Sequence, residues 1–305
     1  DLHSFPTRRS SDLFTCILIG LCICLGCQDS KEYPTKCKES PSQTEEQVLW
    51  PKQEQSDVLS DGSLALVDLS QKNDGYLCAR LLQETEGIKI QIAKNDKKYN
   101  YDLKTTDFKT FPINMGNGSY TIKILQQIEG TRYAICASCT VDVQLTNDLA
   151  PYLYPNQIVD YTADSYVYKK SFELVKEDKD DLTRIAHLFK YVVDTLNYDD
   201  QKAKDVSETF VLPDIDGSLK SHKGICFDYA ASLAALCRIQ GIPAKVIVGW
   251  TDIEYHAWVD IYLKDKGWIN PKIYFKKEKW NLVDPTFADS KNSDYEGKYD
   301  EVYHY

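Results

Sequence analysis

The pattern that constrains the fold most is an apolar helical stretch that opens with a cysteine and leads directly into a strand. Residues 226–240 have a helical pattern and contain four alanines, whose small side chains let a helix lie close against a sheet. Gly241 suits the left-handed position that follows a helix, and Pro243 prevents its continuation. The next residues, 244–250, read AKVIVGW and predict a buried strand. We therefore expect an α+β domain in which this helix packs on an antiparallel sheet.

Cys226 stands in the first turn of the predicted helix, where unpaired N–H groups and the helix dipole favour a thiolate. The thiolate, rather than the thiol, is the nucleophilic form of cysteine. Gly224 precedes Cys226 and permits a close approach of a substrate backbone. The sequence therefore makes Cys226 a candidate nucleophile and places Gly224 in the candidate substrate cleft.

Two later stretches alternate between apolar and polar residues, as half-buried strands do. His256, Trp258 and Asp260 share one face of residues 256–263, and Trp280, Leu282 and Asp284 share one face of residues 279–284. If the two strands pair antiparallel, one register places His256 opposite Asp284, within hydrogen-bond reach. We predict that His256 is the base for Cys226 and that Asp284 orients the imidazole.

Each of these residues also has an ordinary structural explanation. A lone cysteine on a helix is usually a core residue, a histidine at a strand end usually lies at the surface, and Asp before Pro usually marks a turn. His222 is a second histidine near Cys226, but its place on the approach loop makes it a poor base for a thiol on the helix. We expect His222, Tyr198 and Trp258 to line the substrate cleft.

Three stretches resemble the transglutaminase-like superfamily, namely GICFDYAASLAALCRIQGIPAKVIVGW, HAW and WNLVDPTF. The resemblance covers roughly residues 175–290 and implies a papain-like core with a Cys-His-Asp triad, here Cys226, His256 and Asp284. The stretch Asn197-Tyr198-Asp199 also resembles one that precedes the cysteine in that family. Residues 264–278 depart from the family as a long insertion between the two strands, which leaves the triad intact but weakens any analogy about the substrate.

The first half of the chain predicts a different class of domain. Residues 61–155 contain short apolar or alternating runs separated by turn residues, which is typical of a small immunoglobulin-like β-sandwich. We expect a linker over residues 151–164 and then an amphipathic helix that begins near Asp180 or Asp181. The catalytic domain is expected over residues 160–290, with residues 291–305 as a C-terminal tail.

The N-terminal residues predict export and a lipid anchor. Residues 1–13 look like a translated sequencing adapter and are left out of the fold prediction. Residues 14–27 form an uncharged apolar run that ends in a lipobox-like CLGC, so we expect a bacterial signal peptide and lipidation at Cys27. An ordinary signal peptide cleaved nearby is the alternative. Residues 28–60 predict a flexible tether, so the protein would lie outside the cytoplasmic membrane, lipid-anchored or secreted.

Composition argues against several kinds of binding. A formal charge of -10 and a pI near 5.1 disfavour nucleic acid as a partner. Cys136 and Cys139 lie inside a strand-like run and lack two further ligands at similar spacing, so we expect neither a redox nor a zinc role for them. No other His or Cys residues have ligand spacing, and we expect no metal and no cofactor.

The predicted chemistry is thiol acyl transfer on a peptide or protein amide. Transfer to water would make a cysteine peptidase or amidase, which we favour, and transfer to a lysine amine would make a cross-linking transglutaminase. Cross-linking needs an aromatic channel that excludes water, for which Trp250, Trp258 and Trp280 are candidates, although we expect them to serve packing. The remaining alternative is a non-catalytic binding module with this fold.

Overall fold

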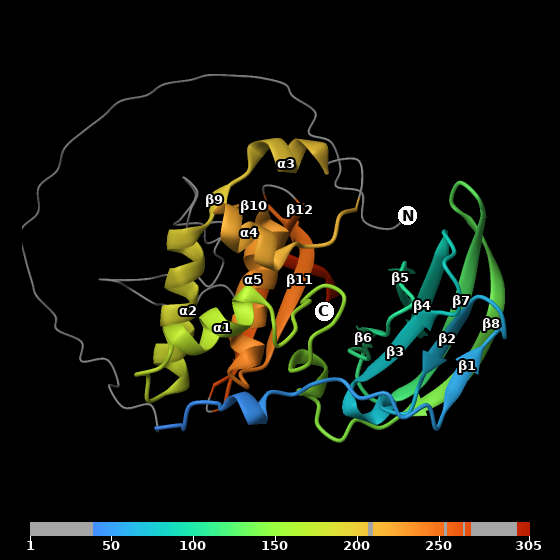
Figure 1. The fold of residues 1–305 in the computed structure, drawn as a ribbon, viewed down its shortest axis with the longest axis horizontal. Coiled ribbons are helices and arrows are strands. Elements are labelled where there is room, and N and C mark those ends of the chain that lie inside the picture. Colours follow the sequence, from blue (N-terminus) through green and yellow to red (C-terminus); the bar gives the residue numbers. More distant parts are fainter. Residues whose placement is uncertain (1–38, 207–209, 253–254, 265, 270–297) are drawn as a thin grey trace, which may run out of the picture.

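The chain forms a β-sandwich followed by a half in which helices cover one sheet (Figure 1). The computed structural model describes residues 39–206, 210–252, 255–264, 266–269 and 298–305. In Figure 1 the sandwich lies on the right, helices α1 to α5 lie on the left, and the C-terminal end lies between them. The predicted α+β class is confirmed, since both sheets of the sandwich and the sheet under the helices are antiparallel.

The sandwich consists of two four-stranded sheets with orders β1-β2-β3-β6 and β5-β4-β7-β8. Their strands are β1 (Val58–Ser60), β2 (Ala65–Asp68), β3 (Tyr76–Leu81), β4 (Ile88–Lys94), β5 (Lys97–Leu103), β6 (Lys109–Pro112), β7 (Gly118–Glu129) and β8 (Arg132–Val143). Short 3-10 helices are η1 (Glu45–Gln47), η2 (Lys72–Asp74) and η3 (Ala150–Tyr152). Alternation explains the packing, because Ile88, Ile90 and Ile92 of β4 are buried while the polar residues between them are half-buried.

The second half contains one sheet of order β13-β12-β11-β14, covered by helices. Its elements are α1 (Tyr166–Leu174), α2 (Asp181–Thr195), β9 (Asn197–Tyr198), α3 (Asp200–Asp205), α4 (Ile215–Ser221), β10 (Lys223–Gly224), α5 (Cys226–Ile239), β11 (Ala244–Thr251), β12 (Tyr255–Leu263), β13 (Gly267–Ile269) and β14 (Tyr299–His304). Helix α2 begins where the sequence predicted, because the Asp180 side chain accepts a hydrogen bond from the N–H of Thr183. No helix in the described part of the chain is both long and apolar enough to cross a membrane.

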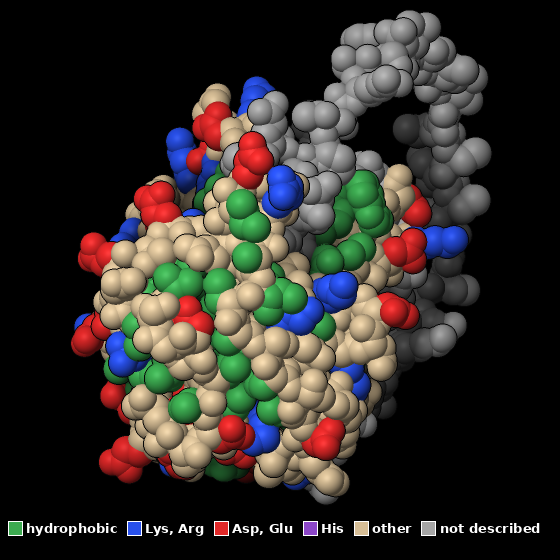
Figure 2. Space-filling model, turned by 90° about the vertical axis from the view of Figure 1, so that its right-hand side faces the viewer, with side chains coloured by type: hydrophobic (Ala, Val, Ile, Leu, Met, Phe, Trp, Pro, Cys, Tyr) green, Lys and Arg blue, Asp and Glu red, His purple; other side chains and the backbone are tan. Residues whose placement is uncertain are grey.

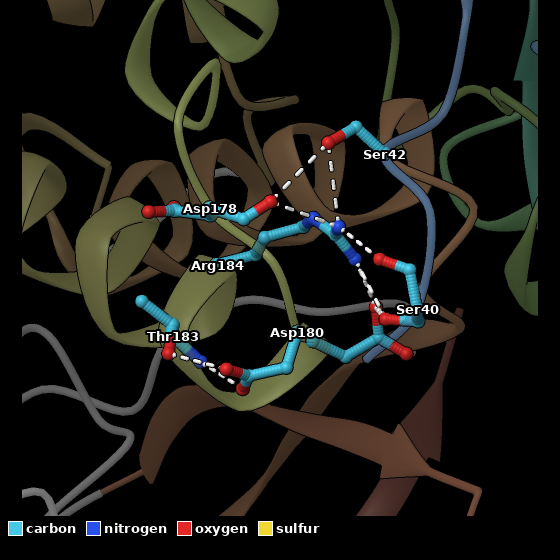
Figure 3. A network of polar contacts seen from close by, with 7 residues as sticks. Ser40, Ser42, Asp178, Asp180, Thr183 and Arg184 are labelled. Carbon is cyan, nitrogen blue, oxygen red and sulfur yellow. Dashed lines mark hydrogen bonds and ion pairs between the residues drawn. The ribbon is translucent and has the colours of Figure 1, made fainter. Parts of the chain in front are cut away.

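The N-terminal segment differs from the predicted tether over residues 39–60. It runs along both halves of the molecule, drawn in blue in Figure 1, and ends as β1 of the sandwich. Arg184 of α2, with 1% of its surface exposed, donates hydrogen bonds to Ser40 and Ser42 (Figure 3). Trp50 packs on Tyr161, with ring centroids 5.7 Å apart. Single polar contacts and one aromatic residue hold the segment, so it shows no periodic pattern in the sequence.

The C-terminal segment also differs from the predicted tail. Residues 299–304 form β14, which pairs antiparallel with β11 and lies on the side of the sheet next to the sandwich. The backbone of Tyr305 exchanges two hydrogen bonds with Val246, at 2.7 and 3.0 Å. The Tyr305 ring is buried and packs edge to face on Tyr99 of β5, with centroids 5.6 Å apart. The last residues therefore join the two halves of the molecule.

The CxxC stretch of β8 lies on the sandwich as two unpaired, half-buried thiols. In a regular strand, residues three apart such as Cys136 and Cys139 would face opposite sides of the sheet. A register shift between Ile124 and Leu125 of β7 leaves Cys136 as an extra residue in the ladder. Because of this bulge both thiols pack partly against the core.

The outer surface of the sandwich has the mixture of apolar, polar and charged side chains that is usual for a protein surface (Figure 2). Figure 2 shows small groups of hydrophobic side chains spread among polar and charged ones. Exposed hydrophobic residues there include Val58 of β1 and Ile135 of β8. Scattered apolar residues of this kind are normal on protein surfaces.

Candidate active site

Cys226 begins α5, as the sequence predicted. Helix α5 packs against β11 and β12 on one side and against α1 and α2 on the other, and all of its residues are buried. Its four alanines are each 0% exposed, which confirms that small side chains allow the close approach of helix and sheet. The Cys226 side chain is 5% exposed and forms no disulfide.

His256 is the second residue of β12, the strand that packs most closely on α5. It is 1% exposed and lies opposite Gly249 of β11. Burial raises the pKa of the neighbouring Tyr255 to about 12, and Tyr303 and Cys226 add smaller electrostatic contributions in the same direction. The thiol of Cys226 therefore lies within electrostatic reach of the residue that precedes His256.

The third predicted member of the triad, Asp284, lies outside the described residues, as do the strand predicted at residues 279–284 and the predicted lipidation site Cys27. The predicted insertion at residues 264–278 contains a strand, since β13 pairs with Ile261–Leu263 of β12. This pairing is confined to the end of β12 that is remote from His256. The insertion thus begins by extending the sheet, a role that a three-residue run is too short to reveal in sequence.

Gly224 lies in β10, which pairs with β9 in parallel, so that Gly224 is opposite Tyr198. A Cβ atom at Gly224 would lie 2.9 Å from the Cβ atom of Asp228, so a side chain has no room there. This steric reason for glycine adds to the predicted need for substrate approach. Tyr198 is 41% exposed and thus lies at the surface beside the loop that leads to Cys226.

His222 terminates α4 in the left-handed conformation, with φ of 60°. Its carbonyl oxygen accepts a hydrogen bond from the N–H of Asn197 at 3.0 Å, and its Nδ1 atom lies 3.2 Å from the carbonyl oxygen of Thr195. The imidazole therefore contacts the backbone of α2, at the junction of α2, α4 and β9.

Trp258 is buried rather than placed at an open cleft, in contrast to the prediction. It is 2% exposed and packs edge-on against Tyr299 of β14, with centroids 4.9 Å apart. A Cβ atom at Gly249 would lie 2.9 Å from its ring. Trp250, by contrast, is 46% exposed and packs on Tyr255. Trp258 therefore serves packing between β11, β12 and β14.

Asp228 is a site residue that the sequence prediction missed. It lies in the first turn of α5, is 1% exposed, and accepts a hydrogen bond from the N–H of Ile225 at 2.9 Å. Lys202 of α3 donates to both of its carboxylate oxygens, at 2.8 and 2.7 Å, and the N–H of Asp214 donates at 3.2 Å. An acidic residue three positions after the residue that precedes a helix is a recognised capping signal, and it could have identified Asp228.

A buried ion pair occupies the sheet face that carries His256. Asp260 of β12 lies 3.7 Å from the Lys245 side chain of β11, and both side chains are largely buried. Burial raises the pKa of Asp260 to about 6, although the positive charge of Lys245 acts in the opposite direction. Among the described residues, no group of three or more His, Cys, Asp or Glu side chains could hold a metal ion.

Comparison with known proteins places the family resemblance on this half of the chain. Residues 168–272 match the model of the transglutaminase-like superfamily, as the sequence motifs predicted. Among curated proteins, none matches this sequence.

Solved structures to which the chain is similar include a candidate cysteine protease from Cytophaga hutchinsonii, with 15% identity, coverage of 76% of this chain and 78% of that one, and a TM-score of 0.38. The periplasmic domain of TgpA from Pseudomonas aeruginosa has 14% identity, coverage of 80% of each chain and a TM-score of 0.32. Red sea bream transglutaminase has 12% identity, coverage of 72% of this chain and 49% of that one, and a TM-score of 0.31.

Proposed function

Residues 168–272 carry a transglutaminase-like core, and we propose that the chain is a cysteine peptidase or amidase that acts on peptide or protein amides. Cys226 is the nucleophile, His256 the general base and acid, and Asp284 the residue that orients the imidazole. The observation that carries the proposal is that Cys226 begins a fully buried helix that packs on the strand bearing His256. A cysteine kept only for packing would not need to stand at the helix terminus.

The reaction follows from these roles. The thiolate of Cys226 attacks the amide carbonyl carbon, and N–H groups of the first turn of α5 stabilise the negative oxygen that forms. The carbon–nitrogen bond then breaks, and protonated His256 gives its proton to the leaving amine. Water attacks the resulting thioester while His256 takes up a proton from it, which releases the acid and restores the thiolate.

The placement of the tryptophans favours water over an amine as the acceptor. A channel that excludes water from a thioester would need aromatic side chains at its mouth. Trp258 is buried under β14, and Trp250 packs on Tyr255 at the surface, so these two do not line a common channel. Hydrolysis is accordingly the simpler outcome for the acyl-enzyme.

Alkylation by iodoacetamide at neutral pH tests the nucleophile. Cys226 should react faster than Cys139, a half-buried thiol in the same chain whose pKa is raised by partial burial. His256→Ala should slow the alkylation of Cys226 and leave that of Cys139 unchanged. Equal rates at both thiols, with no effect of His256→Ala, would remove the basis for the enzyme.

The reaction class is tested by incubating the protein with a peptide library, with and without a primary amine, and analysing the products by mass spectrometry. Hydrolysed peptides that require Cys226 support the proposal. Amine adducts in place of hydrolysis products would assign the chain to the cross-linking class instead.

We also propose that the chain is exported and held at the membrane through a lipid on Cys27, on the basis of the apolar run and the CLGC stretch. In a bacterial host, the chain should incorporate a labelled fatty acid, and Cys27→Ser should abolish the incorporation. Incorporation that survives Cys27→Ser would contradict this assignment.

A further inference from the structure

A cavity of about 360 Å³ lies where the sandwich meets the half that carries Cys226. The sandwich contributes Tyr101 of β5, and the connection to α1 contributes Ile158. The opposite wall comes from Phe210, Val211 and Leu212 in the loop between α3 and α4, and Tyr305 closes the cavity beside β14. Neither half of the molecule encloses this space alone.

Two walls of the cavity lead toward the nucleophile. The ring of Phe210 packs on that of Phe227, with centroids 5.9 Å apart, and Phe227 directly follows Cys226. On the other side, Tyr255 has an electrostatic influence on Tyr305, and Cys226 in turn has one on Tyr255. The wall formed by Phe210 is therefore in contact with the first turn of α5.

The lining suits an uncharged, mainly apolar group. Six of its side chains are aromatic or aliphatic. Of the charged residues at its rim, Asp102 is ion-paired with Lys89 and lies 3.9 Å from Lys104, whose side chain is 81% exposed. The one positive charge left over, on Lys104, therefore points into solvent rather than into the cavity. The volume lies at the lower end of the range for ligand pockets, which fits one large side chain better than a cofactor.

The cavity adjoins a larger and more open one of about 820 Å³ on the sandwich. The two share Lys89, Asp102 and Lys104, and the second extends to Thr85 and Gly87 in the loop before β4. A mainly apolar pocket that adjoins a more polar groove matches a peptide, whose side chain enters the pocket while its backbone follows the groove.

We propose that the interdomain cavity is a substrate subsite that accepts one large apolar side chain of a peptide, so that the sandwich forms part of the substrate-binding surface. This inference rests on the proposed function, since it concerns the substrate of that reaction. It explains why β5 of the sandwich and the loop after α3 face each other beside the catalytic helix.

The test fills the cavity with Val211→Trp. Val211 is 42% exposed, so the larger side chain can be accommodated without unfolding the core. Val58→Trp is the matched control, because Val58 is 46% exposed on β1 and does not line the cavity. Hexapeptide libraries that hold either phenylalanine or alanine at one fixed position serve as probes.

Val211→Trp should lower kcat/KM for the phenylalanine libraries at least tenfold through a higher KM and leave the alanine libraries within twofold. The rate of Cys226 alkylation by iodoacetamide should not change, because the reagent is too small to need the subsite. An equal loss for both libraries, or none, would overturn the proposal.

Binding of the same libraries to Cys226→Ala protein, measured by calorimetry, separates this inference from the proposed function. If the wild-type protein hydrolyses nothing, the proposed function fails, yet a preference for phenylalanine that Val211→Trp removes would still establish the subsite. If Cys226→Ala protein binds the phenylalanine and alanine libraries equally well, the subsite is refuted, whatever the catalytic result.

Discussion

Lys202 and Asp228 form an ion pair, with Nζ 2.7 Å from Oδ2, that ties α3 to the first turn of the helix begun by Cys226. The Asp228 carboxylate is 1% exposed, while the Lys202 side chain is 26% exposed. The same carboxylate accepts the N–H groups of Ile225 and Asp214. One buried side chain thus fixes both the residue before Cys226 and the loop that lines the interdomain cavity.

Lys202→Met should destabilise the fold by about 2–4 kcal/mol, because it leaves the buried Asp228 carboxylate without a counter-charge. Asp228→Asn should cost less, since the amide oxygen can still accept the N–H of Ile225. Urea denaturation measures both changes, and the double variant should regain part of the loss relative to Lys202→Met. Strict additivity of the two changes would show that the pair is not coupled.

Gly249→Ala should detach β14 from the sheet. A Cβ atom at Gly249 would overlap the carbonyl oxygen of Asp300 and lie 2.9 Å from the Trp258 ring, so the backbone of β14 has to move. The expected loss is about 2–3 kcal/mol, measured by thermal or urea denaturation. Gly130→Ala, at a turn with open space, should cost about 1 kcal/mol through its backbone conformation alone. Similar losses for the two variants would contradict the steric argument.

Arg184→Met should release the N-terminal segment. The guanidinium holds Ser40 through its carbonyl oxygen at 2.5 Å and its hydroxyl at 2.9 Å, and it also donates to Asp181. We expect a loss of about 2–4 kcal/mol and faster proteolytic cleavage within residues 39–50. Lys190→Met removes an exposed ion pair from the same helix and should change stability by less than about 0.5 kcal/mol. Unchanged cleavage in Arg184→Met would show that other contacts hold the segment.

Asp260 should make the fold less stable as pH rises from about 4 to 6. Its pKa is about 6 in the folded protein against 3.8 as the ordinary value, so the folded state binds more protons than the unfolded state in this window. The contribution is present below about pH 4 and is lost as pH rises through 6, with a size of at most about 3 kcal/mol. Asp260→Asn should flatten this part of the stability profile, measured by urea denaturation at several pH values. A slope that persists in the variant would assign it to other groups.

The sequence predicted those parts of the fold that show a periodic pattern. The alanine-rich helix with its cysteine, the strand after it and the stripe of apolar residues on α2 all appear where expected. The strands of the sandwich lie where alternating runs and turn residues were noted over residues 61–155. For the candidate site, the positions of Cys226 on the helix and His256 on the strand followed from these same elements.

The remaining features depend on contacts between distant residues. Ser40 and Ser42 are ordered by Arg184, more than a hundred residues away, and β14 is ordered by pairing with β11. Burial of Trp258 follows from β14, so its position could not be predicted while residues 291–305 were taken as a tail. Local pattern does not reveal such long-range partners.

The place of β14 has a consequence for how the protein is made. Strand β11 is synthesised about fifty residues before the strand that pairs with it, so its outer edge stays exposed during that interval. The residues between β11 and β14 form a long loop, which closes slowly compared with the formation of the helices. The two halves can be joined through β14 only after residues 299–305 have left the ribosome. Pairing of β14 with β11 therefore follows the formation of the helices and strands that precede it in the chain.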